Sequence, residues 1–356
     1  MKVLVPSRES SSYAAPHRRA VRAWCVVVPL DRGEEVRKAL RDRGVLLKHL
    51  RIVQEAGRLY LPTIRRMDVG LPTAEREFEE AFVPIPSYKD LVHVPERSRA
   101  SLPTSFDVIG DIAVLKIPEK LLAHRREIAD AILAWNTKVS VVAQDHGVGG
   151  ELRVRKLEIL AGENRTTTVH VEYGLRYRVD VSRAYFSPRL ATERRRIAEQ
   201  VKPGEAVADP FAGVGPYAIL IAKRRQPSRV HASDANPAAV ELLRQNVAAN
   251  RADSVEVREG DAREILRRIG PVDRVILDLP HTAMDFLPDA MGALGTRGAV
   301  HVYAILDDAE REDRAREIRL AVEREGGRVE SMRLHVVRAY SPTQHHVAFD
   351  VTAGPG

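Results

Sequence analysis

The chain has 356 residues, one cysteine and a formal net charge of +7 at pH 7, with a sequence pI near 9.6. Its length suits two or three domains. The single cysteine, Cys25, excludes a disulfide framework and a cysteine-rich zinc site. This low use of cysteine is typical of proteins of the reducing cytosol. No apolar window approaches the roughly 18 residues of a membrane span, and the first twenty residues do not resemble a signal peptide. We therefore expect a cytoplasmic protein that does not enter a membrane.

The positive charge comes mostly from arginine, whose guanidinium group binds phosphate oxygens in pairs. This composition favours a partner that carries phosphate, and nucleic acid is the leading hypothesis. A heat-adapted surface with many ion pairs is the alternative. It would explain the abundance of arginine and glutamate, but it would not explain the net excess of positive charge.

The first part of the chain predicts a small α+β module over residues 1–66. Residues 23–29 (AWCVVVP) are typical of a buried strand, residues 34–44 show helical spacing that ends in glycine, and apolar runs follow at 50–53 and 59–61. Residues 67–104 are rich in proline, arginine, glutamate and serine and show weak periodicity. This composition predicts a linker or an irregular connection.

A second module, the middle α+β domain, is predicted over residues 105–190. It combines one helix, at residues 121–135, with six strand signals. These strand signals lie at residues 106–110, 112–117, 138–144, 152–160, 166–174 and 176–181.

From residue 191 to residue 356 helices and strands alternate regularly, which predicts a doubly wound, Rossmann-like α/β sheet with its ligand at the carboxyl ends of the strands. The final two strands are expected to form an antiparallel hairpin at one edge. Helices are predicted at 192–201, 215–224, 237–250, 284–294 and 310–325, and strands at 206–209, 229–234, 255–261, 272–280, 299–306, 329–337 and 345–352.

The segment 209–216, DPFAGVGP, predicts a strand that turns sharply into a helix beneath a ligand. Gly213 and Gly215 let backbone N–H groups approach the ligand closely, and the helix offers the positive end of its dipole. A dinucleotide site would favour a third glycine at position 218. Ala218 is tolerated there, so glycine spacing alone does not exclude a nicotinamide cofactor.

Three acids decide between the cofactors. Asp209, Asp234 and Asp261 close successive predicted strands, where Asp234 can accept the ribose hydroxyls and Asp261 the adenine amino group. Any one of them alone could be a helix N-cap. Together they suit the cationic S-adenosylmethionine better than a pyrophosphate. The predicted cofactor residues are Asp209, Phe211, Gly213, Val214, Gly215, Asp234, Ala235, Asp261, Ala262 and Asp278.

The fourth strand of this domain leads into Asp278-Leu279-Pro280-His281. This motif resembles the Asp/Asn-Pro-Pro-Tyr/Phe pocket of methyltransferases that act on a planar nitrogen. His281 would lie beside the target base, or it could cap the next helix. His345 and His346 are adjacent on a predicted strand and face opposite ways, so they do not form a metal pair.

The whole chain resembles the archaeal and eukaryotic tRNA guanine-37 N1-methyltransferases. The resemblance rests on residues 150–196, on DPFAGVGP, on SDANPAAV at 233–240 and on VRAYSPTQHHVAFDV at 337–351. It implies a class I methyltransferase domain at residues 191–356 that binds S-adenosylmethionine and acts on tRNA. It also implies that the N-terminal module binds the tRNA body, the alternative being an oligomerisation or stability module.

By the resemblance, Arg153 is the catalytic arginine, Glu193 the general base and Tyr185 an active-site tyrosine. A carboxylate suits removal of the N1 proton of guanine, a guanidinium suits the charge that then builds on O6, and methyl transfer depends on positioning. Without the resemblance, Glu193 could be a first-turn helix acid and Arg153 a surface arginine. The other predicted site residues are Asp278 and Pro280 in catalysis and His281 and Arg189 in substrate binding.

Asp278 departs from the asparagine that is common in the family. An ionised aspartate accepts hydrogen bonds but does not donate them, so recognition of the base edge must differ. The Asp-Leu-Pro-His form resembles an archaeal subgroup linked to the wyosine pathway, some of whose members also methylate carbon 7 of the tricyclic wyosine intermediate. A second activity of that kind is a hypothesis.

The expected partner is tRNA, and we expect a monomer without a metal. Three other classes of function remain open from the sequence. They are transfer of the aminocarboxypropyl group from the same cofactor, methylation of an exocyclic amine in RNA or DNA, and non-catalytic RNA binding.

Overall fold

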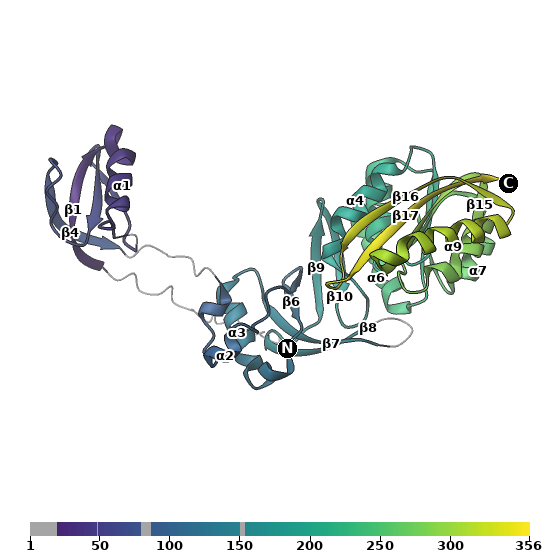
Figure 1. The fold of residues 1–356 in the computed structure, drawn as a ribbon, viewed down its shortest axis with the longest axis horizontal. Helices are drawn as coiled ribbons and strands as arrows, with labels where there is room; N and C mark the ends of the chain where they lie inside the picture. The colour runs from purple at the N-terminus through teal and green to yellow at the C-terminus, as the bar shows by residue number, and fades with distance from the viewer. Residues whose placement is uncertain (1–19, 48, 80–86, 150–153) are drawn as a thin grey trace, which may run out of the picture. The chain divides into compact units, whose positions relative to one another are not determined.

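The computed structural model describes residues 20–47, 49–79, 87–149 and 154–356 (Figure 1). The chain divides into two compact units, Met1–Pro86 and Ser87–Gly356. None of the helices within these described ranges combines the length and the apolar character needed to cross a membrane.

Over residues 20–47 and 49–79, the N-terminal unit is a four-stranded antiparallel sheet with one α-helix, which confirms the predicted α+β class of this module. The strand order is β2-β3-β1-β4. One face packs Val26 and Val28 of the central strand against Val36 and Leu40 of the helix, and all four side chains are buried. The elements are β1 (Ala20–Pro29), α1 (Gly33–Asp42), β2 (Val53–Glu55), β3 (Arg58–Thr63) and β4 (Thr73–Glu79).

The prediction of an irregular connection is wrong for residues 73–79. They form β4, which pairs antiparallel with β1 over Ala20↔Glu79 to Val26↔Thr73. The strand TAEREFE contains a single large apolar side chain, Phe78, and this is its one fully buried residue. Because β4 is an edge strand with one buried residue, its sequence lacks the apolar alternation that announces a strand.

The second unit begins with a middle domain in which α3 covers a four-stranded sheet of order β5-β6-β7-β8. Residues 88–99, which the sequence assigned to the connection, contribute to its core, because Tyr88 and Val92 are buried in it. The elements are α2 (Glu96–Arg99), β5 (Asp107–Ile109), β6 (Ile112–Leu115), α3 (Arg125–Trp135), β7 (Val141–Gly149) and β8 (Val154–Gly162).

A two-stranded hairpin, β9 (Thr167–Glu172) and β10 (Leu175–Asp180), precedes the C-terminal domain. Asn246 of helix α6 (Pro237–Asn250) accepts a 2.7 Å hydrogen bond from the Arg178 N–H and donates one of 3.0 Å to the Arg178 carbonyl. A side-chain amide therefore occupies the open edge of β10 in place of another strand.

The C-terminal domain has a seven-stranded sheet of order β13-β12-β11-β14-β15-β17-β16. Its first five strands are parallel, whereas β17 runs antiparallel between β15 and the edge strand β16. The predicted doubly wound sheet and edge hairpin are therefore confirmed. The strands are β11 (Ala206–Asp209), β12 (Arg229–Asp234), β13 (Val255–Glu259), β14 (Val272–Leu277), β15 (Leu294–Asp307), β16 (Gly327–Ala339) and β17 (Gln344–Pro355).

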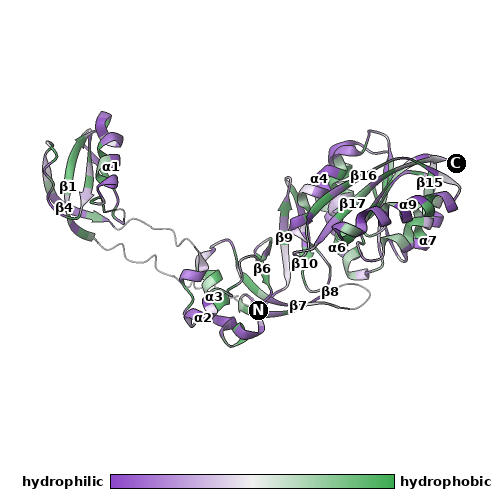
Figure 2. Ribbon diagram, viewed as in Figure 1, coloured by the Kyte–Doolittle hydropathy of each residue, from purple (hydrophilic) through white to green (hydrophobic). Residues whose placement is uncertain are grey.

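Helices cover both faces of this sheet, with α4, α5 and α6 packed on one face and α7, α8 and α9 on the other. Figure 2 shows hydrophilic residues on the exposed sides of helices such as α9. The sequence did not predict α7, a short helix that buries Ile265 and Leu266. The helices are α4 (Ala191–Gln200), α5 (Pro216–Arg225), α6 (Pro237–Asn250), α7 (Ala262–Arg268), α8 (Leu287–Ala293) and α9 (Arg311–Arg324).

Candidate cofactor and catalytic site

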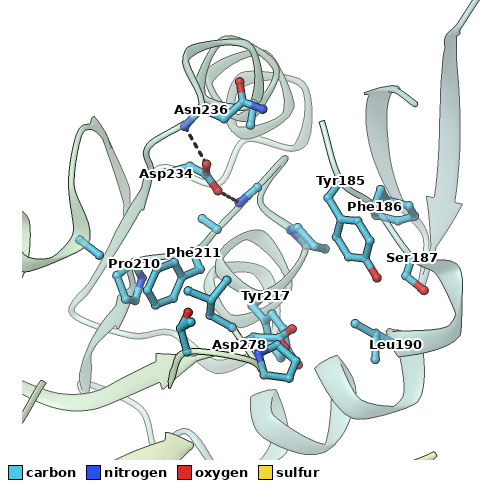
Figure 3. A pocket seen from close by; sticks show the side chains of 18 of the residues that line it. Tyr185, Phe186, Ser187, Leu190, Pro210, Phe211, Tyr217, Asp234, Asn236 and Asp278 are labelled. Atoms are coloured by element: carbon cyan, nitrogen blue, oxygen red, sulfur yellow. Dashed lines mark hydrogen bonds between the residues drawn. The ribbon is translucent and has the colours of Figure 1, made fainter. Parts of the chain in front are cut away.

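A cavity of about 600 Å³ opens at the carboxyl ends of β11, β12 and β14 (Figure 3). Its volume is in the range of pockets that hold a cofactor-sized ligand, and its position agrees with the ligand site of open α/β sheets. The predicted site residues that line it are Tyr185, Phe211, Gly213, Asp234, Ala235, Asp261, Ala262, Asp278 and Pro280.

The glycine loop turns β11 into α5 through two residues in the left-handed region. Gly215 has φ +92° and forms the N-cap of α5. A Cβ atom built on it would lie 2.3 Å from Cδ1 of Leu243, so a larger residue would force that side chain to shift and would strain the backbone. Gly213 has φ +53°, and its N–H donates a 2.8 Å hydrogen bond to Asp234. The predicted tight turn is thus present, although Val214 and Gly215 are not among the residues that line the cavity.

Asp234 is held in one orientation at the end of β12. Its two carboxylate oxygens accept hydrogen bonds from the backbone N–H groups of Gly213, at 2.8 Å, and Asn236, at 2.9 Å (Figure 3). Burial raises the pKa of this carboxyl above its usual value. The carboxylate lines the cavity, where the remaining lone pairs can accept hydroxyl protons of a ligand.

Asp261 follows β13 by two residues, because that strand ends at Glu259. Its side chain accepts a 2.8 Å hydrogen bond from the Arg263 N–H and caps α7. The capping alternative is therefore confirmed for this acid. Asp261 lines the cavity as well, so the cap also fixes the carboxylate at the wall.

Asp209 is fully buried beneath the cavity and is not one of the residues that line it. Burial raises its pKa well above the usual value, and the negative charges of Asp278 and Asp234 add to this effect. Asp234 and Asp261 line the cavity, whereas Asp209 does not. A direct contact of Asp209 with the cofactor therefore stays a prediction.

We expect Asp209→Asn to stabilise the ligand-free protein at alkaline pH. The pKa of Asp209 is higher in the folded than in the unfolded state. As pH rises past about 4, the pKa of this carboxyl in the unfolded chain, the unfolded chain loses the Asp209 proton before the folded protein does. The free energy of unfolding of the wild type therefore falls. Thermal melting should give equal midpoints for both proteins near pH 4 and a midpoint several degrees higher for the variant at pH 8. A melting midpoint that is higher for the wild type than for the variant at pH 8 would contradict the raised pKa of Asp209 in the folded protein.

The motif Asp278-Leu279-Pro280-His281 follows β14, which ends at Leu277. A 3.0 Å hydrogen bond from the Thr282 N–H to the Leu279 carbonyl closes the turn, and Asp278 and Pro280 line the cavity. His281 is exposed and is not part of the wall. The N-cap of the following helical turn is Thr282, so His281 does not cap that turn, and its place beside the target base stays a prediction.

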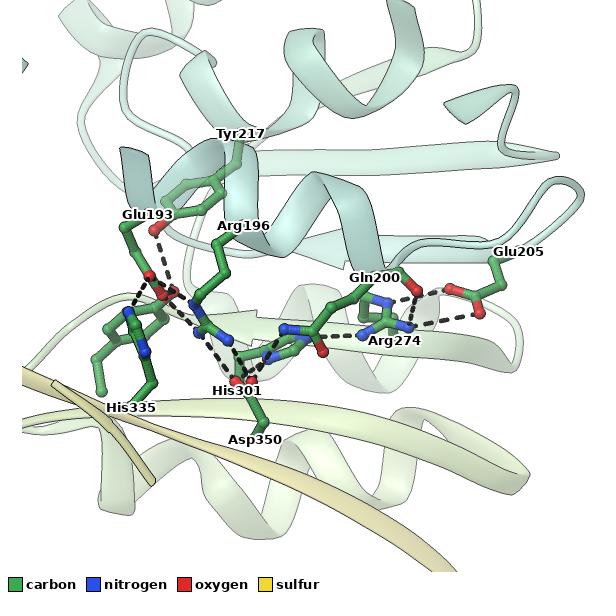
Figure 4. A network of polar contacts seen from close by, with 10 residues as sticks. Glu193, Arg196, Gln200, Glu205, Tyr217, Arg274, His301, His335 and Asp350 are labelled. Carbon is green, nitrogen blue, oxygen red and sulfur yellow. Dashed lines mark hydrogen bonds and ion pairs between the residues drawn. The ribbon is translucent and has the colours of Figure 1, made fainter. Parts of the chain in front are cut away.

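Glu193 lies in the first turn of α4 and its side chain is 1% exposed. Both oxygens accept 2.7 Å hydrogen bonds from Arg196, and Oε1 also accepts a 2.6 Å bond from the Tyr303 hydroxyl (Figure 4). Glu193 does not line the cavity, but Tyr217 does, and the Tyr217 and Tyr303 hydroxyl oxygens are 3.1 Å apart. Two hydroxyl groups therefore connect the carboxylate to the cavity wall.

A chain of buried charges fixes Arg196 on its other side. Arg196 forms an ion pair with Asp350, which contacts Nδ1 of His301 at 2.7 Å, and Nε2 of His301 lies 2.7 Å from Arg274 (Figure 4). Although burial raises the pKa of Asp350, its hydrogen bonds with His301 and Arg196 lower it below the usual value overall. The Arg196 guanidinium therefore stays paired on both sides and holds Glu193 in place.

Tyr185 lies at the cavity with 39% of its surface exposed, and the Arg155 guanidinium lies 5.6 Å from its ring centroid. Arg189, the other predicted substrate contact, forms a 2.6 Å hydrogen bond with Asp107 and is not part of the cavity wall. Arg153 lies outside the described residues.

Sequence reasoning missed several residues of the cavity wall, among them Tyr217, Arg338, Tyr340 and His346. The last three belong to the segment VRAYSPTQHHVAFDV, which drew attention by resemblance without a role for these side chains. The predicted opposite orientation of the two histidines is confirmed, because the His345 side chain is 28% exposed and that of His346 is 4% exposed. Within the described ranges, no group of three or more histidine, cysteine or acidic residues is arranged to hold a metal.

Three family profiles match the chain. Residues 168–330 match the TRM5/TYW2 methyltransferase domain, residues 89–166 the TYW2 N-terminal domain and residues 25–69 the tRNA methyltransferase 5 N-terminal domain. These matches fall in the N-terminal unit, the middle domain and the C-terminal domain in turn, and the last of them ends before β17.

Individual relatives agree with the profiles. The tRNA (guanine(37)-N(1))-methyltransferase Trm5b of Pyrococcus abyssi is 38% identical over 91% of this chain and 97% of its own. Its crystal structure superposes with a TM-score of 0.78 over 93% of this chain and 99% of that one. The tRNA 4-demethylwyosine(37)-methyltransferase Taw21 of Saccharolobus solfataricus is 32% identical over 69% of this chain and 93% of its own.

A solved complex of aTrm5 with tRNALeu is 30% identical, with a TM-score of 0.74 over 92% of this chain and 99% of that one. The three profiles follow one another along the chain in the order of its domains, and a cavity lies at the strand ends of the last one. The similarities to individual relatives extend over nearly the full length. The chain belongs to the Trm5 family of tRNA (guanine-37-N1)-methyltransferases.

Proposed function

We propose that this protein transfers a methyl group from S-adenosylmethionine to N1 of guanine 37 in tRNA. The observation that carries the proposal is the cavity at the strand ends, in which Asp234 and Asp278 face a ligand and a buried carboxylate, Glu193, connects to the wall through two hydroxyl groups. Family membership supports the substrate, and the arrangement of acids supports the cofactor.

The residues present suit S-adenosylmethionine. Asp234 would accept the ribose hydroxyls, and Asp261 would accept the adenine amino group. The negative charges of Asp278 and Asp234 favour a ligand with a sulfonium and an ammonium group over a pyrophosphate. When bound, the cofactor supplies an electrophilic methyl group, and the task of the protein is to align this group with N1.

We infer that Glu193 is the final acceptor of the N1 proton. The Tyr303 hydroxyl donates its one proton to Glu193, so the hydrogen bond between the two tyrosines must run from Tyr217 to Tyr303. Burial raises the pKa of both tyrosines well above the usual value, so both hydroxyls stay protonated. The Tyr217 oxygen is thereby left as an acceptor at the cavity wall.

Proton removal can then proceed along this chain. The proton leaves N1 for the Tyr217 oxygen, the Tyr217 proton moves to Tyr303, and the Tyr303 proton moves to Glu193. The net change is one proton transferred from guanine to the carboxylate. The negative charge that remains on the base is delocalised onto O6. By the resemblance, the Arg153 guanidinium would stabilise this charge. Tyr185 is exposed at the cavity, where its ring would contact the flat face of the base.

Asp234→Ala should weaken binding of S-adenosylmethionine by about tenfold to a hundredfold, because charge-assisted hydrogen bonds to the ligand are lost. The Gly213 N–H would also lose its partner and the loop its orientation. Calorimetric titration of the cofactor measures the change, with the exposed Asp253→Ala as the matched control. Equal affinities of Asp234→Ala and wild type would show that Asp234 does not hold the cofactor.

The proposed function is tested with labelled S-adenosylmethionine and two tRNA transcripts that differ only in guanosine or adenosine at position 37. We expect label in the guanosine transcript alone. Equal labelling of both transcripts would exclude guanine 37 as the target.

A second candidate function is methylation of the tricyclic base 4-demethylwyosine at the same tRNA position. The similarity to Taw21 favours it, and Asp278 in place of the family asparagine gives a chemical reason for a changed substrate range. Incubation with tRNA that carries this base would give a product one methyl group heavier if the second activity is present.

Binding of the tRNA body by the N-terminal unit likewise stays a prediction, supported by its match to the N-terminal domain of this family.

A further inference from the structure

His346 lies on β17 at the cavity wall and differs from the other histidines of the C-terminal sheet. Its residue surface is 3% exposed, and its Nε2 atom has no hydrogen-bond partner among the described residues. The nearest charged oxygen, Oδ1 of Asp278, is 3.9 Å away, beyond hydrogen-bond distance. A buried polar atom without a partner costs free energy, which is offset when a ligand supplies the partner.

The packing around His346 fixes its ring at the cavity wall, with Nε2 on the side of Asp278. The ring packs against that of Tyr303 with centroids 5.5 Å apart and planes inclined at 53°, and the residue is paired with Ile305 of β15 and Arg338 of β16 on its two sides. Burial lowers the pKa of His346 to about 4, with a further contribution from Arg338. The imidazole is therefore neutral at physiological pH and carries one N–H, and the neighbouring Asp278 carboxylate favours the tautomer with that proton on Nε2.

We propose that His346 determines base specificity together with Asp278: the Nε2–H of His346 donates to O6 of the target guanine, and Asp278 accepts from its exocyclic amino group. This inference rests on the proposed function, since it assigns the residues that read the base at that same site. Guanine presents O6 as an acceptor and its amino group as a donor on either side of N1. One donor and one acceptor 3.9 Å apart at a cavity wall match that pattern.

The pair also accounts for aspartate at position 278. The asparagine that is common in the family offers a donor and an acceptor in one side chain, whereas a carboxylate offers acceptors alone. In this chain His346 supplies the donor that Asp278 lacks. Adenine, with an amino group where guanine has O6 and no amino group at carbon 2, would present a donor to His346 and no amino group to Asp278.

The test compares three variants on tRNA with guanosine at position 37. His346→Leu removes the donor, His346→Gln keeps an N–H at a similar reach, and His345→Leu changes the neighbouring histidine on the opposite face of the strand, where it pairs with Asp308. We expect His346→Leu to lower kcat/KM by about tenfold to a hundredfold, His346→Gln to recover most of this loss and His345→Leu to stay within about twofold of wild type. Cofactor affinity by calorimetry should be the same in all four proteins.

A transcript with inosine at position 37 separates the two contacts, because inosine keeps O6 and lacks the amino group. The loss caused by His346→Leu should be the same on guanosine and inosine. The inference is overturned if His346→Leu retains wild-type kcat/KM, if His346→Gln is no better than His346→Leu, if either variant weakens cofactor binding, or if the loss disappears with inosine. Wild-type activity on the guanosine transcript, measured in the same assay, tests the proposed function separately from this role of His346.

Discussion

Replacing Glu193 with glutamine is expected to lower kcat for methylation of guanine 37 by about 10²–10⁴-fold, the usual contribution of a general base. The amide cannot take up the proton that leaves N1. The Tyr303 hydroxyl can still donate to the amide oxygen, whereas the amide nitrogen cannot accept the second hydrogen bond from Arg196. Arg196 keeps its ion pair with Asp350. The rate of a single turnover with saturating cofactor and tRNA measures this change most directly.

Glu199→Gln is the matched control for this experiment. Glu199 lies on the same helix, α4, but its side chain is 58% exposed and forms an ion pair with Arg195 at 2.7 Å. We expect this control to retain wild-type activity, and both variants to bind S-adenosylmethionine as wild type does. A Glu193→Gln variant with kcat within a few-fold of wild type would exclude Glu193 as the base.

Replacing Arg194 with leucine is expected to destabilise the protein by about 3–5 kcal/mol, the cost of removing one partner from a buried ion pair. Arg194 and Glu172 are 2% and 6% exposed, and their side chains form two hydrogen bonds of 2.9 and 2.6 Å. Arg194 also donates to the Ser187 carbonyl at 3.1 Å. The pair joins α4 to β9, so the leucine variant would leave the Glu172 carboxylate buried without its partner.

Urea denaturation measures the free energy of unfolding for this prediction. The double variant Arg194→Leu/Glu172→Leu should recover most of the lost stability, because it leaves no unpaired charge. Arg195→Leu, at the next and 62% exposed position, should change stability by less than about 0.5 kcal/mol. A single variant that loses less than about 1 kcal/mol, or a double variant less stable than Arg194→Leu, would contradict the account of the pair.

The parts of the fold that the sequence predicted well are those with strong local signals. The bounds of β11, β12 and α6 agree with the predicted ranges 206–209, 229–234 and 237–250. Each strand is a short, mostly buried segment that ends in aspartate, and α6 begins with proline after the capping residue Asn236. By contrast, β4 has one buried side chain and obtains its hydrogen bonds from β1, about fifty residues earlier, so no local pattern announces it.

The same distinction applies to the site. Asp234 and Asp278 could be predicted at the cavity because parallel strands in a doubly wound sheet end on the same side. Burial of Asp209 and the link from Glu193 through Tyr303 depend on how α4 packs on the sheet, which no local pattern encodes. His346 is at the cavity because the antiparallel register of β15 and β17 pairs it with Ile305. Sequence alone predicted that His346 and His345 face opposite ways, but it could not tell which of them faces inwards.

Nucleoside mass spectrometry of tRNA tests the central claim most directly. An unmodified tRNA-Phe transcript with guanosine at position 37 is incubated with the protein and S-adenosylmethionine and then digested to nucleosides. The proposed function predicts 1-methylguanosine from position 37, with no product when the transcript carries adenosine there. An aminocarboxypropyl nucleoside, a guanosine methylated on its exocyclic amine, or no modified nucleoside at all would contradict it.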